Sequence, residues 1–199
     1  MPPPPLAESL TTAAAEYLAA ERKAPYKSEY INGRVYAMAG ASRAHVLICG
    51  NLVREIGNQL RGRPCETYGS DMRVKVLRTG MYTYPDVAAL CDEPRMEDGQ
   101  FDTLLNPAVI IEVLSPSTES YDRGEKFAHY RRLDSLREYV LVAQTLRRVE
   151  HFRREGDSWV LTEISEPEGE LVLSSLGCAV KLADIYDRIS FSAAEMLEG

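Results

Sequence analysis

A glutamate interrupts an apolar run that is typical of a buried strand. Residues 109–114 read Val-Ile-Ile-Glu-Val-Leu, so Glu112 is a carboxylate among large aliphatic side chains. Burying an ionised carboxylate costs several kcal/mol unless it is paired or binds a metal. A second acid, Asp86, lies 26 positions earlier in another strand-like run. Two acids on core strands, with Lys126 downstream, predict a site that holds a hard divalent cation against a phosphodiester.

Each of these residues also has a plainer interpretation. Glu112 could form a buried ion pair with Arg73, Lys75 or Lys126. Asp86 follows a proline, a combination that is common in turns. Lys126 could be a solvated helix lysine, as most lysines are.

Other chemical motifs are absent from the sequence or lack partners. The chain has no G-x-S-x-G nucleophile elbow, no P-loop and no dinucleotide glycine fingerprint. His45 lies on the apolar stripe of a predicted helix and is interpreted as a core or capping histidine. His129 and His151 have no partners at metal-ligand spacing. The four cysteines form no C-x-x-C pair, which argues against a zinc ribbon and favours reduced thiols in a cytosol.

Length and charge set further bounds. The 199 residues carry a net charge of -7, which argues against sequence-blind coating of nucleic acid but permits a local basic cleft. No apolar run approaches the roughly 20 residues that span a bilayer. Residues 1–9, rich in proline, are predicted to form a disordered leader, and residues 10–190 a single domain. We therefore expect a cytoplasmic protein without membrane contact.

Periodicity and turn signals predict a mixed α/β domain with helices flanking a central sheet. Thr11 or Thr12 is expected to cap the first helix, and Asp122 to cap a later one. The alternation after Asp71 places Arg73 and Lys75 on a face directed to solvent or ligand. In chain order, the predicted elements are a helix over 10–22, strands over 26–31 and 35–38 joined by an Asn-Gly turn, a helix over 42–60, strands over 71–77, 83–90 and 108–114, a helix over 122–133, a strand over 138–143, a hairpin of 149–153 and 159–164, a strand at 171–173 and a helical turn at 182–188.

An ordered set of short segments resembles the Uma-type restriction endonucleases, a bacterial branch of the PD-(D/E)XK nuclease superfamily. The resemblance covers roughly residues 12–187, and no single motif carries it alone. The matching segments are residues 16–22, 29–33, 36–42 with His45, 70–72, 84–86, 112–118, 122–126 and 138–142.

The resemblance implies a restriction-endonuclease-like fold, with a mixed sheet flanked by helices and a C-terminal hairpin. It implies that Asp86 and Glu112 bind Mg²⁺ or Mn²⁺. The superfamily pattern has a lysine two positions after the second acid, where this chain has Leu114. In this branch the lysine has moved to the next helix, and Lys126 matches that place.

The expected function is metal-dependent hydrolysis of DNA phosphodiester bonds, with Asp86, Glu112 and Lys126 as catalytic residues. Arg73 and Lys75 are expected to contact backbone phosphate. Glu29 and His45 fit the family pattern near the site without an assigned role. A homodimer is expected because nucleases of this class often cut two strands with paired sites. The alternatives are a catalytically inactive nuclease-fold module that binds DNA or protein, and an assembly protein with an acidic surface.

Overall fold

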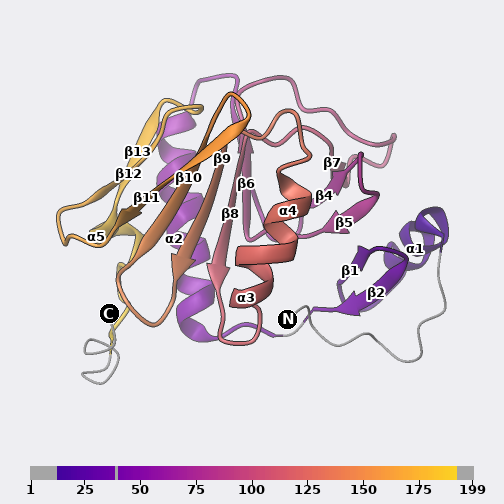
Figure 1. The fold of residues 1–199 in the computed structure, drawn as a ribbon, viewed down its shortest axis with the longest axis horizontal. Coiled ribbons are helices and arrows are strands. Elements are labelled where there is room, and N and C mark those ends of the chain that lie inside the picture. Colours follow the sequence, from indigo (N-terminus) through magenta and orange to yellow (C-terminus); the bar gives the residue numbers. More distant parts are fainter. Residues whose placement is uncertain (1–12, 39, 192–199) are drawn as a thin grey trace.

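The computed structural model describes residues 13–38 and 40–191. A six-stranded sheet lies at the centre, with a five-stranded sheet beside it and helices on both faces (Figure 1). The elements are α1 (Ala14–Glu21), β1 (Ser28–Ile31), β2 (Arg34–Ala37), α2 (Arg43–Leu60), β3 (Glu66–Gly69), β4 (Arg73–Val76), β5 (Met81–Thr83), β6 (Val87–Leu90), β7 (Thr103–Leu104), β8 (Val109–Leu114), α3 (Glu119–Tyr121), the π-helical turn η1 (Asp122–Lys126), α4 (Phe127–Tyr130), β9 (Glu138–Ala143), β10 (Val149–Glu155), β11 (Ser158–Ile164), β12 (Glu170–Leu173), β13 (Cys178–Lys181) and α5 (Leu182–Ile185).

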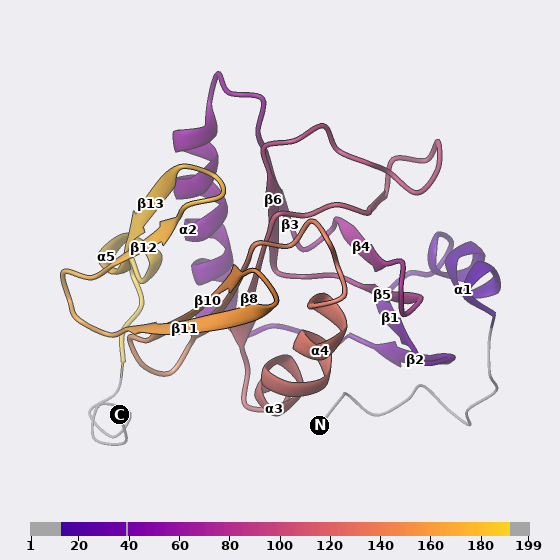
Figure 2. The same cartoon turned by 45° about the horizontal axis from the view of Figure 1, so that its top comes forward.

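The central sheet has the order β11-β10-β9-β8-β6-β3. β8 and β9 pair in parallel, and the other neighbours pair antiparallel. Because side chains alternate along a strand, β8 supplies both faces of the sheet. Val109, Ile111 and Val113 pack with α2, α5 and the β12–β13 hairpin. Ile110 and Leu114 pack with residues of α3, α4 and the smaller sheet. Helices α3 and α4 lie on the face of the central sheet opposite α2 (Figures 1 and 2).

The predicted mixed α/β core with flanking helices is confirmed, and two hairpins, β10–β11 and β12–β13, follow in the C-terminal part. The Asn-Gly turn is also confirmed, since Asn32 and Gly33 both have positive φ angles, 50° and 83°, between paired strands. The predicted leader and the capping residues Thr11 and Thr12 lie outside the described residues. Ala13 occupies the N-cap of α1. In the described part of the chain, no helix is both long and apolar enough to cross a membrane.

The prediction of one strand over 83–90 is wrong. β5 ends at Thr83 and belongs to the smaller sheet, whereas β6 begins at Val87 in the central sheet. Pro85 lies between them, and a proline cannot donate a hydrogen bond to a sheet ladder. The break sends the chain from one sheet to the other and leaves Asp86 at the start of β6.

The predicted cap of the helix after β8 is also wrong. Helical structure begins at Glu119 with Thr118 in the N-cap position, and Asp122 lies inside the helix with φ -62° and ψ -40°. Ser115 organises this earlier start, because its carbonyl accepts from the Glu119 amide at 2.9 Å. Strands β3, β7 and β13 were not predicted, since none of them has a long apolar run like those of β8 and β9.

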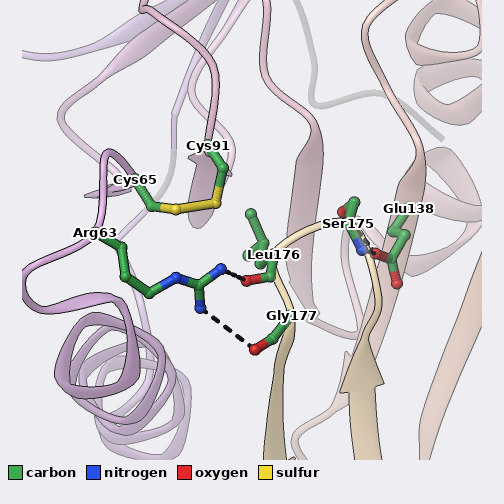
Figure 3. Close-up of a disulfide and its surroundings, with 7 residues drawn as sticks. All are labelled: Arg63, Cys65, Cys91, Glu138, Ser175, Leu176 and Gly177. Carbon is green, nitrogen blue, oxygen red and sulfur yellow. Dashed lines mark hydrogen bonds between the residues drawn. A yellow bond between two sulfur atoms is a disulfide. The ribbon is translucent and has the colours of Figure 1, made fainter.

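Two of the four cysteines depart from the predicted reduced state. Cys65 and Cys91 form a disulfide at the ends of β3 and β6, where the strand register brings their Cα atoms to 3.9 Å (Figure 3). Next to it, the Arg63 guanidinium donates to the carbonyls of Leu176 and Gly177 and ties the end of α2 to the β12–β13 hairpin. Cys49 and Cys178 are free thiols, as predicted.

Candidate active site

The two predicted acids lie opposite one another at one end of the central sheet. β6 and β8 are antiparallel, with Val87 opposite Ile111, so the next pair along this register is Asp86 and Glu112. An Asp86 carboxylate oxygen, Oδ2, accepts from the Val113 amide at 2.7 Å, which fixes Asp86 against β8. The two acids are therefore neighbours in backbone register, and the charge of Asp86 acts on Glu112. Their side chains contact different elements, Asp86 reaching His45 of α2 and Glu112 reaching Lys126 of η1, and a cation shared by both stays a prediction.

Glu112 is almost completely buried, with 3% of its surface exposed. Its Oε1 accepts from Lys126 Nζ at 2.9 Å and from the Tyr130 hydroxyl at 2.8 Å. Burial raises the pKa of Glu112 to about 8; the Lys126 charge opposes the shift, and the charges of Asp122 and Asp86 add to it. A carboxylate in this setting is poorly compensated by the protein alone.

Lys126 points back into the site from η1. Its Nζ lies 2.9 Å from Glu112 Oε1, 3.3 Å from Glu29 Oε1 and 3.5 Å from Asp122 Oδ1. Burial disfavours its charge, but Glu112 and Glu29 hold the pKa of Lys126 well above its usual value. The solvated interpretation of Lys126 is therefore wrong, and the buried ion pair considered for Glu112 forms with Lys126.

Aromatic packing holds this helix against the sheet. The Phe127 ring stacks on Tyr139 of β9 with centroids 4.5 Å apart, and the Tyr139 hydroxyl donates to the Asp122 carbonyl at 2.9 Å. Asp122 is buried, and burial raises the pKa of its carboxyl although Lys126 opposes the shift. The packing fixes Asp122 and Lys126 one turn apart, with both side chains directed inward.

Glu29 enters the site from the smaller sheet. It is 4% exposed and accepts a hydrogen bond from the Thr83 hydroxyl, in addition to its contact with Lys126. The sequence matched Glu29 to the family pattern but gave it no role. Residues 26–31 also contain Lys27 and Ser28, so Glu29 lacks the uniformly apolar surroundings that identified Glu112.

The site contains more negative than positive charge. Glu29, Glu112 and Asp122 surround Lys126, and the adjacent Asp86 contacts His45. Carboxylate oxygens are the preferred ligands of Mg²⁺ and Mn²⁺. Within residues 13–38 and 40–191, both hydrogen-bonding contacts of Glu112 fall on Oε1. The donor set and its charge therefore fit a hard divalent cation.

His45 connects the site to α2. Its backbone amide donates to the N-cap Ser42 hydroxyl at 3.1 Å, which confirms the helix start, but its ring does not lie in the apolar core. The ring Nε2 lies 3.2 Å from Asp86 Oδ2, and Nδ1 lies 3.6 Å from Cys49 Sγ. Burial lowers the pKa of His45, but the contact with Asp86 outweighs it and the net shift is upward.

Arg73 and Lys75 are engaged elsewhere. Arg73 is 4% exposed and donates to the Tyr84 hydroxyl and to Thr103, each at 2.9 Å. Lys75 is paired with Glu97. The prediction of an open polar face is therefore wrong for Arg73, because β7 pairs with this strand and Thr103 and Tyr84 supply buried partners.

A family model, two sequence relatives and a solved structure match this chain. The model of the Uma2 family, described as "Putative restriction endonuclease", matches residues 14–183. Two uncharacterized proteins of Synechocystis sp., sll1609 and slr1290, are 40% and 36% identical over 81% and 88% of the chain and 92% of their own lengths. A crystal structure described as a putative nuclease belonging to DUF820, from Anabaena variabilis, superposes with a TM-score of 0.72 at 20% identity, covering 89% of this chain and 98% of that one.

Proposed function

Because the chain belongs to the Uma2 restriction endonuclease family, we propose that it is a metal-dependent endonuclease that hydrolyses DNA phosphodiester bonds. The observation that carries the proposal is the pairing of Asp86 with Glu112 at the sheet end, within a cluster of carboxylates that Lys126 only partly neutralises. The crystal structure of similar fold is itself described as a putative nuclease, which is consistent with the proposal.

Asp86 and Glu112 would hold Mg²⁺ or Mn²⁺. When bound, such a cation lowers the pKa of a bound water and polarises the scissile phosphate. Lys126 orients Glu112 through its 2.9 Å contact and places a positive charge next to the region where phosphate charge would build up. Tyr130 holds the same Glu112 oxygen and limits the rotation of the carboxylate.

A second candidate function is an inactive nuclease-fold module that binds DNA or protein. It is favoured by Leu114, which occupies the position of the superfamily lysine, and by the three carboxylates that already surround Lys126. In this case the cluster would be a structural ion-pair network.

Plasmid cleavage in Mg²⁺ and in Mn²⁺ separates the two candidates. We expect Asp86→Asn and Glu112→Gln each to lose cleavage by at least about 100-fold, since each removes a metal ligand. Glu97→Gln is the matched control, because Glu97 is also an ion-paired carboxylate but lies beside β4 and β5. Cleavage that survives both site substitutions would refute the site. Binding of DNA by the wild type with no cleavage would favour the module.

Two further expectations accompany the proposed function. A homodimer would place two such sites on opposite DNA strands, and light scattering of the purified protein measures its mass directly. A cytoplasmic location stays a prediction. Free-thiol counting on protein extracted under rapid alkylation tests whether Cys65 and Cys91 are paired in cells.

A further inference from the structure

Three donor atoms of different chemistry meet beside the proposed nuclease site. His45 and Cys49 are four residues apart on α2, so their side chains share one face of the helix. Asp86 approaches this face from the start of β6. One imidazole nitrogen, the Cys49 sulfur and one Asp86 oxygen all lie within 4.8 Å of one another.

This donor set differs from that of the acidic cluster. Thiolate and imidazole ligands favour Zn²⁺ and similar softer cations, whereas Mg²⁺ takes oxygen ligands. Zinc sites with three protein ligands keep a fourth position for water, and two ligands are often supplied one turn apart on a helix. The H-x-x-x-C spacing at 45–49 is therefore the sequence signal of such a site.

The site is also accessible and rigid. The side chains of His45 and Asp86 are 17% and 13% exposed, so a cation can reach them from solvent. Two ligands lie on an 18-residue helix whose apolar side is fully buried against the sheet. The third is held by the Val113 amide. Little rearrangement is needed to bring the three atoms around one ion.

We propose that His45, Cys49 and Asp86 form a binding site for Zn²⁺, distinct from the Mg²⁺ or Mn²⁺ position at Asp86 and Glu112. Since Asp86 belongs to both sets, zinc at this site removes a ligand from the other cation. Zinc is therefore an inhibitor of cleavage, a consequence that rests on the proposed nuclease function. The binding itself does not depend on that function.

Cobalt replaces zinc as a spectroscopic probe. Titration of the full-length protein with Co²⁺ alone should produce a sulfur-to-cobalt charge-transfer absorption and intense visible bands of a tetrahedral ion, both reversed by Zn²⁺. Cys49→Ser should lose the charge-transfer band. Cys178→Ser is the matched control, because Cys178 is the other free thiol and lies on β13. His45→Gln should weaken cobalt binding by at least about 100-fold, more than loss of an outer-shell partner costs.

Thermal unfolding checks that each variant is folded. A wild-type spectrum without the charge-transfer band would overturn the proposal, as would a band that survives Cys49→Ser or disappears in Cys178→Ser. Glu112→Gln separates the two proposals, since it should lose cleavage and retain the cobalt spectrum. Retention of the spectrum in a protein that never cleaves DNA would refute the nuclease and leave the zinc site standing.

Discussion

Glu112→Gln should make the metal-free protein more stable at neutral and mildly alkaline pH. The pKa of Glu112 is raised from an ordinary value of 4.5 to about 8, first because the group is buried. The folded state therefore holds this proton over a pH range in which the unfolded chain has lost it. The stability that protonated Glu112 contributes is therefore complete below a pH of 4.5 and is lost as the pH rises toward about 8. Glutamine keeps the shape and the acceptor oxygen without this loss.

The size of the effect follows from linkage. Each pKa unit corresponds to about 1.4 kcal/mol, so raising pH from about 5 to about 8 should increase the advantage of the variant by up to about 3 kcal/mol. For a chain of this length, that corresponds to roughly 6–12 °C in Tm. The Lys126 contact reduces the gain, because glutamine forms a weaker bond to the ammonium than a carboxylate does.

Thermal and urea unfolding in the presence of a chelator, at several pH values, measure the difference. The control is Glu97→Gln, which leaves Lys75 without its carboxylate partner and should lose stability. Parallel stability curves for wild type and Glu112→Gln across the pH range would refute the reasoning. Such a result would mean that Glu112 is fully compensated in the folded protein and that the cluster has no surplus charge for a cation to neutralise.

Three other changes have defined outcomes. Lys126→Met should cost about 3–5 kcal/mol in urea unfolding, since it leaves three buried carboxylates without their cation, and a cost near zero would contradict the buried network. Replacing Cys65 and Cys91 by serine opens a link between residues 26 positions apart and should cost about 3 kcal/mol, whereas equal unfolding with and without reductant would show that no bond forms in solution. Glu138→Gln should lose stability at neutral pH and less below the ordinary carboxyl range, because hydrogen bonds from His151 and Ser175 lower the pKa of Glu138 against its burial; an equal loss at both pH values would contradict this.

The central sheet was predictable because its strands have strong apolar patterns. β8 and β9 are buried along their whole length, and the sequence places both within one residue of their observed bounds. Glu112 was predictable for the same physical reason, since a carboxylate in such a strand must have a compensating partner. Lys126 was proposed from its place downstream of the two acids and supported by the family resemblance, and its spacing alone would not have distinguished it from a solvated lysine.

The remaining features depend on contacts between distant segments. Arg73 alternates like a surface residue, but Thr103 and Tyr84 bury it, and nothing local to β4 indicates that partner strand. The Cys65–Cys91 pair depends on the register of β3, a strand whose sequence has no marked apolar pattern. Glu29 reaches the site only because the smaller sheet packs against the helix that carries Lys126.

The π-helical turn at 122–126 has a consequence for how this active-site arrangement could arise. A turn of this type contains one residue more than an α-helical turn, the product expected from a single-codon insertion. Removing that residue would rotate everything after it by about 100°, since an α-helix has 3.6 residues per turn. The rotated helix could then no longer keep the present contacts of Lys126, Phe127 and Tyr130 at the same time. The wide turn lets one short segment place the Lys126 charge on Glu112 and the Phe127 and Tyr130 rings on Tyr139 of β9. The number of residues in this segment is therefore constrained more tightly than their types.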